Sequence, residues 1–367
     1  MPPTLIQSLM PETTSILAPA NPGQAQPAYD PRQTYDWNYD HAPEAPPGKE
    51  TAVSGQWDFC GLPVGSPLGV AAGPLLNGKW ILYYAALGFD VLTYKTVRSR
   101  ARACYPMPNL QPVAAGRVSG EEEPVAASAE MRGSWAVSCG MPSKAPEEWR
   151  ADIRATRAVL PKHKILSVSV VATPEADWTL AEVAADFARC ARWAVESGAD
   201  CVEANFSCPN VASADAQLYQ QPEAASLVAA SLREVIRSKP LLIKIGHVTD
   251  ERLAAELSQA VAPYADSLVM VNCVAARVAD ASQRLMFEGQ KRGIAGEAIR
   301  DAALDQVKLF AKVIQRRSLG LRLVGVGGIA TAANVRTYLA AGSHSVQIAT
   351  AAMLDPGMGL QIRRNLA

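Results

Sequence analysis

The feature that most constrains the fold is a rhythm of eight short apolar segments, rich in β-branched residues, that runs through most of the chain. They are Leu68–Ala71, Val91–Tyr94, Ile165–Val171, Cys201–Asn205, Leu241–Ile245, Ser267–Asn272, Leu323–Val326 and Ser345–Ile348. Most are continuous apolar runs, which strands need when both of their faces are buried. The segments therefore predict a parallel sheet that is covered by other elements.

Helical patterns fill most gaps between these segments, with apolar residues three and four positions apart. The predicted helices lie within Asp177–Ser197, Glu223–Ser238, Asp250–Ala262, Leu304–Arg317 and Thr331–Ala341. A strand followed by a helix, repeated eight times, is typical of a (β/α)8 TIM barrel in the α/β class. A doubly wound open sheet is the alternative fold for such a pattern.

Two stretches depart from this rhythm. Residues 1–55 are crowded with prolines and show no helical or strand period, which predicts an arm that is disordered or extended over a partner subunit. Residues 56–367 are then the barrel domain. A long insert, Arg98–Met141, separates the second and third segments. Because it follows a strand, we expect it at the C-terminal mouth of the barrel, as a wall or lid of the pocket.

The composition excludes several classes of function. Lys plus Arg and Asp plus Glu number 35 each, so no net charge favours nucleic acid or an acidic membrane. No apolar run approaches the roughly 20 residues of a transmembrane helix. Met1–Leu17 lacks the Lys or Arg with which a secretory signal begins. The seven cysteines form no CxxC pair, which predicts no metal site and a reducing, cytoplasmic location.

A glycine-rich turn, Gly325–Ala330, follows the seventh segment and precedes a predicted helix at Thr331. Gly327 and Gly328 allow backbone amides to approach a phosphate, and the start of the helix adds a favourable dipole. Thr350 follows the eighth segment and adds a hydroxyl. The loops after strands seven and eight are the usual phosphate site of such barrels, although a tight turn alone would also use two glycines.

Cys208 stands on the predicted loop after the fourth strand, between Asn205 and Asn210. Amides donate and accept hydrogen bonds, so this pair suits a ring that carries imide or carboxylate groups. The thiol can then accept or donate a proton at a carbon atom. The alternative is that Cys208 is a small buried hydrophobe.

Two lysines, Lys95 and Lys244, lie in or at the end of apolar strands, where a cation needs an anion or a strong acceptor. They predict contact with a flavin ring, whose edge gains negative charge on reduction, or else structural ion pairs. Asn272 adds an amide at the end of the sixth strand. The small residues Ala72 and Gly73 at the end of the first strand let a flat ring approach the backbone.

Together these pieces resemble the dihydroorotate dehydrogenase family, in particular its soluble class one type, and the related FMN barrel of dihydropyrimidine dehydrogenase. The resemblance runs from Gly61 to the C-terminus and is most specific in the block from Glu203 to Asn210. Further matching motifs are Lys95-Thr96, Lys244, Val271-Asn272, Gly293-Ile294-Ala295-Gly296, Gly325-Val326-Gly327-Gly328-Ile329 and Val346-Gln347-Ile348-Ala349-Thr350.

The resemblance implies an FMN-dependent oxidoreductase of pyrimidine biosynthesis that acts on a CH–CH bond of a dihydropyrimidine-type ring, with Cys208 as general base or acid. The implied substrate ligands are Lys95, Asn205, Asn210, Asn272 and Cys273. The implied FMN ligands are Ala72, Gly73, Lys95, Thr96, Lys244, Asn272, Gly296, Gly327, Gly328, Ala349 and Thr350. It also implies a homodimer and an electron acceptor that is fumarate, a quinone, or NAD reached through a separate subunit.

Two positions depart from the family pocket: Val137 replaces a substrate-binding Asn, and Cys273 replaces a Ser or Thr. Losing two polar groups weakens the binding of the original ligand by a few kcal/mol. The sequence therefore also allows the substrate of a dihydropyrimidine dehydrogenase-like enzyme, or another ring. A phosphate-substrate lyase or isomerase, with Lys244 as a Schiff base, and a non-catalytic subunit are the remaining alternatives.

Overall fold

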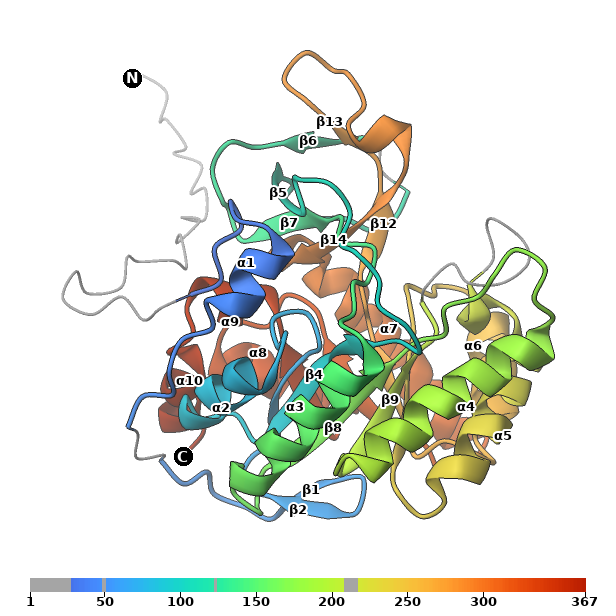
Figure 1. Cartoon of the computed structure of the whole chain (residues 1–367). Helices are drawn as coiled ribbons and strands as arrows, with labels where there is room; N and C mark the ends of the chain where they lie inside the picture. Colours follow the sequence, from blue (N-terminus) through green and yellow to red (C-terminus); the bar gives the residue numbers. More distant parts are fainter. Residues whose placement is uncertain (1–27, 48–50, 122–123, 208–216) are drawn as a thin grey trace, which may run out of the picture.

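A computed structural model describes residues 28–47, 51–121, 124–207 and 217–367. Eight parallel strands close into a barrel at its centre (Figure 1). In chain order they are β3 (Leu68–Val70), β4 (Val91–Val97), β8 (Ile165–Val170), β9 (Cys201–Asn205), β10 (Leu241–Lys244), β11 (Ser267–Met270), β15 (Arg322–Val326) and β16 (Ser345–Ile348). Each of the eight apolar segments forms one of these strands, so the predicted (β/α)8 barrel is confirmed.

The barrel closes where β16 pairs with β3, with Gln347 opposite Gly69. A Cβ atom on Gly69 would lie 2.8 Å from the carbonyl oxygen of Val91 on the next strand. A glycine is therefore required at this point of closure, since any side chain would push the strands apart.

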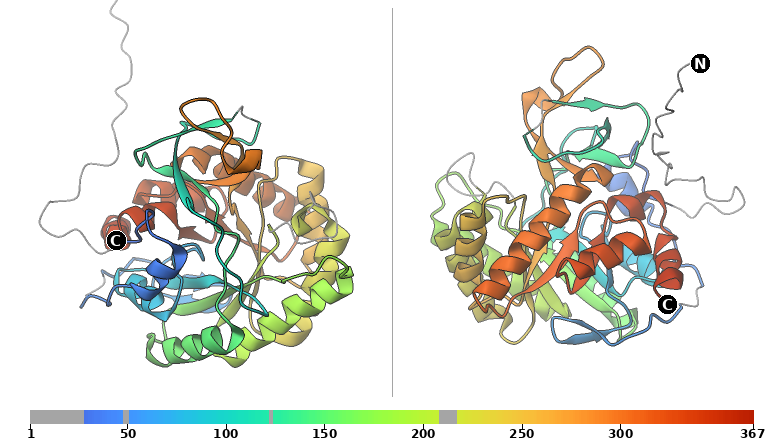
Figure 2. Two further views of the ribbon diagram at one scale, coloured as in Figure 1. Left: turned by 45° about the horizontal axis from the view of Figure 1, so that its top comes forward. Right: turned by 180° about the vertical axis from the view of Figure 1, so that it is seen from behind.

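Helices surround the barrel on all sides, as the two further views of the chain show (Figure 2). They are α2 (Gly78–Ala86), α3 (Pro146–Val159), α4 (Leu180–Glu196), α5 (Pro222–Ile236), α6 (Glu251–Val261), α7 (Arg300–Arg316), α8 (Ala332–Ala340), α9 (Thr350–Leu354) and α10 (Met358–Leu366). All five predicted helices are present within a few residues of the expected bounds. The start of α4 shows why: the Thr179 hydroxyl accepts from the Glu182 amide while the Glu182 carboxylate accepts from the Thr179 amide.

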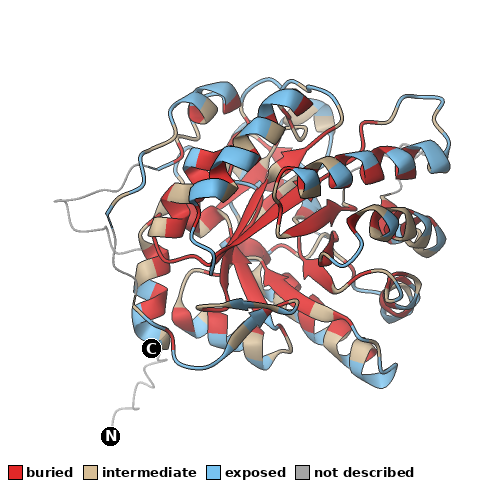
Figure 3. Cartoon of the chain, turned by 60° about the horizontal axis from the view of Figure 1, so that its bottom comes forward, coloured by how far each residue is buried: buried red, intermediate tan, exposed pale blue. Residues whose placement is uncertain are grey.

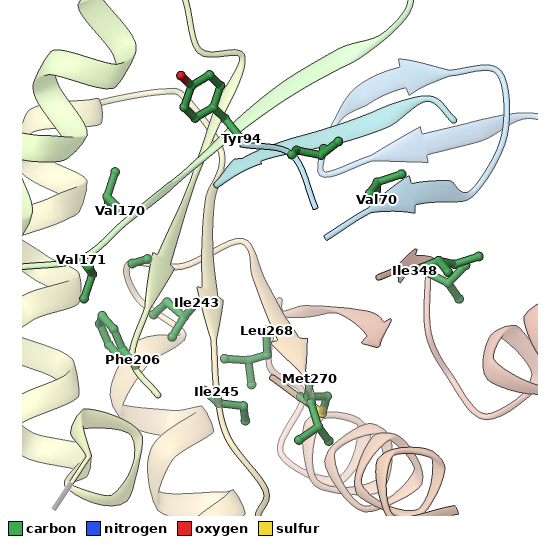
Figure 4. Close-up of a cluster of buried hydrophobic side chains, with 14 of the residues drawn as sticks. Val70, Tyr94, Val170, Val171, Phe206, Ile243, Ile245, Leu268, Met270 and Ile348 are labelled. Carbon is green, nitrogen blue, oxygen red and sulfur yellow. The ribbon is translucent and has the colours of Figure 1, made fainter. Parts of the chain in front are cut away.

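Apolar side chains on the outer face of the strands form the main core. Figure 4 shows this layer, in which Tyr94, Phe206 and Ile243 belong to one buried cluster with side chains of the surrounding helices. A second cluster fills the barrel itself, with Cys201, Leu242 and Val269 among its members. Because side chains alternate along a strand, the residues two positions further along β9 and β10 also point inward.

A hairpin of β1 (Trp57–Phe59) and β2 (Leu62–Val64) packs against this inner cluster, with Phe59 as its buried member. Figure 3, which shows the chain from below, places the hairpin across the lower end of the barrel. This end holds the N-terminal starts of the strands and is filled by side chains. A substrate site is therefore left to the opposite end.

A mixed sheet lies over that opposite end (Figure 1). Its strands, in order across the sheet, are β12 (Val274–Ala276), β14 (Arg292–Gly296), β7 (Ser134–Val137), β5 (Leu110–Ala114), β6 (Val125–Ala127) and β13 (Val278–Ala279). The Arg98–Met141 insert supplies three of these strands, and a second insert after β11 supplies the others. The two inserts thus form one structure above the C-terminal ends of the barrel strands.

Part of the N-terminal segment packs against the same chain. Residues 28–47 include α1 (Tyr35–Asp40), which lies beside α2. The Trp80 indole donates to the carbonyl of Asn38 over 2.9 Å, and the Asn77 amide donates to the carbonyl of Tyr39 over 2.7 Å. Residues 1–27 lie outside the described part of the chain.

None of the helices in the described ranges is long and apolar enough to cross a membrane. The same ranges contain no group of three or more His, Cys, Asp or Glu side chains placed to hold a metal ion.

Candidate functional site

Lys95 lies where the first two barrel strands meet the N-terminal segment. Its ammonium donates to the carbonyl of Gly73 over 3.3 Å and lies 5.9 Å from the centre of the Tyr35 ring. Thr96 beside it pairs its hydroxyl with that of Ser169 at 3.0 Å. The predicted ligands Lys95 and Gly73 are thus in contact, and Tyr35 forms part of the same wall.

Lys244 ends β10 and lies beside Asn205, its register partner at the end of β9. Both side chains point into the barrel, and Lys244 is only 4 % exposed. In the described part of the chain, the carboxylate that pairs with it is that of Glu203, 3.8 Å from the ammonium, which is too long for a hydrogen bond. The buried ammonium therefore keeps its donors for a ligand at the mouth.

Ser207 joins two of the predicted substrate amides. Its hydroxyl donates to Asn205 Oδ1 over 2.7 Å and accepts from the Asn272 side-chain amide. The Asn205 amide also lies 3.4 Å from the sulfur of Met141, at the end of the first insert. The structure therefore brings Asn205 and Asn272 together through a residue that the sequence analysis did not single out.

The two positions that depart from the family pocket meet at Gly293. Val137 is the register partner of Gly293 in the sheet over the mouth, so their Cα–Cβ directions share one face. A Cβ atom on Gly293 would lie 2.9 Å from the sulfur of Cys273. Val137 and Cys273 thus lie close together and make one side of the site poor in hydrogen-bonding groups. Burial raises the pKa of the Cys273 thiol to about 11, against the opposing charge of Lys244.

Two further thiols lie close to Lys95. Cys104 and Cys139 stand on adjacent segments joined by a hydrogen bond from the Tyr105 amide to the Cys139 carbonyl at 3.1 Å. A hydrogen bond from the Cys104 thiol lowers the pKa of Cys139, and the charge of Lys95 lowers it further. The same pairing raises the pKa of Cys104. Cys139 is therefore the thiol of this pair that is poised to ionise.

We expect iodoacetamide at pH 7.5 to modify Cys139 faster than the five other described cysteines. The thiolate is the nucleophile, and Cys139 has the lowered pKa, whereas burial raises the pKa values of Cys190 and Cys201. Peptide mapping by mass spectrometry measures the rates, and Lys95→Ala is expected to slow the reaction. Equal rates at Cys139 and Cys104 would contradict the assignment.

The glycine-rich turn after β15 packs tightly against the start of α7. Gly327 and Gly328 have φ values of +133° and +62°, and a Cβ on Gly328 would lie 2.5 Å from that of Arg300. The Arg300 guanidinium donates to the carbonyl of Gly328 over 2.8 Å. The amides of Ala330 and Thr331 are occupied by the Asn334 side chain. Any phosphate at this turn must therefore use the amides that precede Ala330.

The other predicted FMN ligands lie either beside this turn or at the end of β3. The 3₁₀ segment Glu297–Ile299, which directly follows Gly296, reaches the turn, and a Cβ on Gly327 would lie 3.4 Å from the Ile299 side chain. Ala349 precedes α9 and lies 3.9 Å from the position of a Cβ on Gly73. Ala72 and Thr350 are buried in the same region of β3 and α9.

Cys208 and Asn210 lie outside the described residues, so the structure does not test their predicted roles. Ser207, directly before them, holds both described amides. The residues that sequence reasoning did not identify are Ser207, Glu203 and Tyr35. Ser207 and Glu203 belong to the block from Glu203 to Asn210, and the specificity of that block was the sequence signal that could have identified them.

The fold and site define a barrel enzyme whose polar side chains gather at the C-terminal ends of the barrel strands. The buried Lys244 ammonium makes no hydrogen bond to any described residue, so its donors are available to a ligand. Comparison with known proteins agrees with this. The model of the dihydroorotate dehydrogenase family matches residues 55–367, and the chain belongs to this family.

Among individual relatives, the dihydroorotate dehydrogenase of Dictyostelium discoideum is 30 % identical over 84 % of this chain and 87 % of its own length. The catalytic subunit of dihydroorotate dehydrogenase B (NAD⁺) from Desulforudis audaxviator is 27 % identical over 86 % of this chain and 91 % of its own. The chain is thus a flavin-dependent oxidoreductase that acts on a CH–CH bond. The lyase, isomerase and non-catalytic alternatives are not favoured.

Proposed function

We propose that the protein binds FMN and oxidises dihydroorotate or a closely similar dihydropyrimidine ring, with Cys208 as the general base. The observation that carries this proposal is the group Lys244, Asn205, Ser207 and Asn272, whose charge and amides meet at the ends of neighbouring strands. The Gly327–Gly328 turn supports FMN, which carries one phosphate.

In the proposed reaction, Asn205, Asn210 and Asn272 hold the substrate ring through its imide and carboxylate groups. The Cys208 thiolate would remove a proton from one ring carbon, and bound FMN would supply the acceptor for the hydride that leaves the neighbouring carbon. Lys244 and Lys95 would contact the flavin and offset the negative charge that it gains on reduction. Ala72, Gly73, Thr96, Gly296, Ala349 and Thr350 are the remaining proposed FMN contacts.

The substrate pocket has a polar side and a less polar side. Asn205, Ser207 and Asn272 form the polar side, whereas Val137 and Cys273 meet at Gly293 on the other. This less polar side would suit a ring that carries an apolar substituent on the edge facing it. A dihydropyrimidine dehydrogenase-like substrate is therefore the second candidate.

The direct test is to purify the protein with its flavin and add dihydroorotate, dihydrouracil and dihydrothymine under anaerobic conditions. Bleaching of the flavin absorbance by dihydroorotate first and fastest supports the proposal. Bleaching by dihydrothymine alone would favour the second candidate, a dihydropyrimidine dehydrogenase-like substrate. A colourless protein that does not take up FMN would contradict both.

Ser207→Ala is expected to lower kcat/KM for the reducing substrate about tenfold, because Asn205 and Asn272 lose the hydroxyl that orients them. The flavin content should stay at the native level. Ser231→Ala is the matched control, since that hydroxyl bonds only to its own helix, α5, on the outside of the barrel. Equal effects of the two substitutions would contradict the bridging role.

The electron acceptor, the homodimer and the cytoplasmic location stay predictions. Stopped-flow mixing of the bleached protein with each candidate acceptor shows which one reoxidises the flavin. The candidates are fumarate, a quinone, and NAD reached through a separate subunit. Light scattering measures the oligomeric state.

A further inference from the structure

The carboxylate of Glu203 is buried inside the barrel with little compensation for its charge. The residue is fully buried, and neither carboxylate oxygen accepts a hydrogen bond from any described residue. Glu203 lies in β9 between Cys201 and Asn205 and points inward with them, below the mouth. Among the described residues, its one close cation is Lys244, 3.8 Å away.

This arrangement is expensive for the fold. A buried carboxylate without hydrogen bonds is strongly disfavoured, and a single cation at 3.8 Å only partly compensates for its lost hydration. Two apolar side chains of similar size would fill the space at lower cost. The pair therefore points to a function in the site that uses Lys244.

The position of the pair indicates that function. Glu203 precedes Asn205 by two residues in β9 and therefore lies one level deeper in the barrel. Lys244 is the register partner of Asn205, so the ammonium lies between the carboxylate and the mouth. A cation at the flavin favours reduction, because it offsets the negative charge that builds up on the ring. An anion directly behind the cation reduces that effect.

We infer that Glu203 is a positioning residue that holds the Lys244 ammonium toward the barrel interior and thereby lowers the reduction potential of the bound flavin. The inference rests on the proposed contact between Lys244 and FMN. Its consequence for turnover is that the flavin is not held too strongly in its reduced form and can pass its electrons to the acceptor.

The test is the midpoint potential of FMN in the holoenzyme with Glu203→Gln, which keeps the shape of the side chain and removes its charge. The ratio of the affinities for reduced and oxidised FMN is expected to rise about tenfold in this variant. For a two-electron couple this corresponds to an upward shift of about 30 mV. An unchanged or lower potential would overturn the inference.

Two further variants separate a specific effect from a structural one. In the background of Lys244→Met, the ammonium that Glu203 is inferred to hold is absent, so adding Glu203→Gln should shift the potential less than it does in the native protein. An equal shift in both backgrounds would show that Glu203 does not act through Lys244. Asp90→Asn, at a buried ion pair at the other end of the barrel, should leave the potential at its native value.

The outcome is also distinguishable from a failure of the proposed function. If the native protein takes up no FMN, the proposed function fails. If it binds FMN and Lys244→Met lowers the potential but Glu203→Gln has no effect, only the role of Glu203 fails.

Discussion

Replacing Cys208 with alanine is expected to leave FMN bound while slowing flavin reduction by the substrate by about 10²–10⁴-fold. The substitution removes the proposed proton acceptor and leaves in place Asn205 and Asn272, the proposed ligands of the ring, with Ser207 between them. Stopped-flow absorbance under anaerobic conditions, with dihydroorotate in excess, measures the rate. The dissociation constant of FMN, measured by fluorescence, should stay within a small factor of the native value.

Cys60→Ala is the control for that experiment. It makes the same chemical change in the β1–β2 hairpin, at the end of the barrel opposite the proposed site. Native reduction rates are expected for this variant. Reduction of the Cys208→Ala protein at the native rate would rule out the thiol as the base, whatever its flavin content.

The barrel could be predicted from the sequence because its strands are local and strongly patterned. Runs such as Leu241–Lys244 are apolar throughout, and the helices that follow them carry their own periodicity. The helix α3 is harder to find, because it lies at the end of the long second gap. Its inward residues Trp149, Ile153 and Thr156 are separated by four and three positions, but one of them is polar.

The sheet over the mouth could not be predicted, because its pairing is long-range and its strands are short. Val137 pairs with Gly293, more than 150 positions away, and β13 has two residues. A short apolar run in each insert carries no sign of its partner. For the same reason, the meeting of Val137 and Cys273 at one point of the site became visible only in the folded chain.

The site shows the same division. Residue types at strand ends predicted Lys244, Asn205 and Asn272, because a polar side chain there is unusual enough to indicate a function. The contacts among them depend on side-chain directions across several strands. Ser207 as a bridge between two amides, and Glu203 as the partner of Lys244, follow from distances that no spacing in the sequence encodes.

Asp90→Asn is expected to lower the free energy of unfolding by about 3–5 kcal/mol. Asp90 is fully buried before β4 and binds two cations, Arg363 of α10 at 2.7 Å and Lys164 before β8 at 3.1 Å. The Ser66 hydroxyl donates to the same carboxylate. The neutral amide would remove a buried negative charge that two cations share, which costs more than the loss of the hydrogen bonds alone. Urea denaturation followed by circular dichroism measures the change.

Asp305→Asn is the control for Asp90→Asn, because it removes an ion pair that is exposed to water and not buried. Asp305 lies 3.1 Å from Lys308 with both side chains more than half exposed, so water already stabilises the charges. Its removal is expected to cost less than about 1 kcal/mol. The contrast matters because Asp90 ties the last helix to the start of the second barrel strand, far from the proposed site. A destabilised Asp90→Asn protein that keeps native flavin reduction while folded would show that this ion pair supports the barrel and not the chemistry, whereas equal small losses in both variants would contradict its structural role.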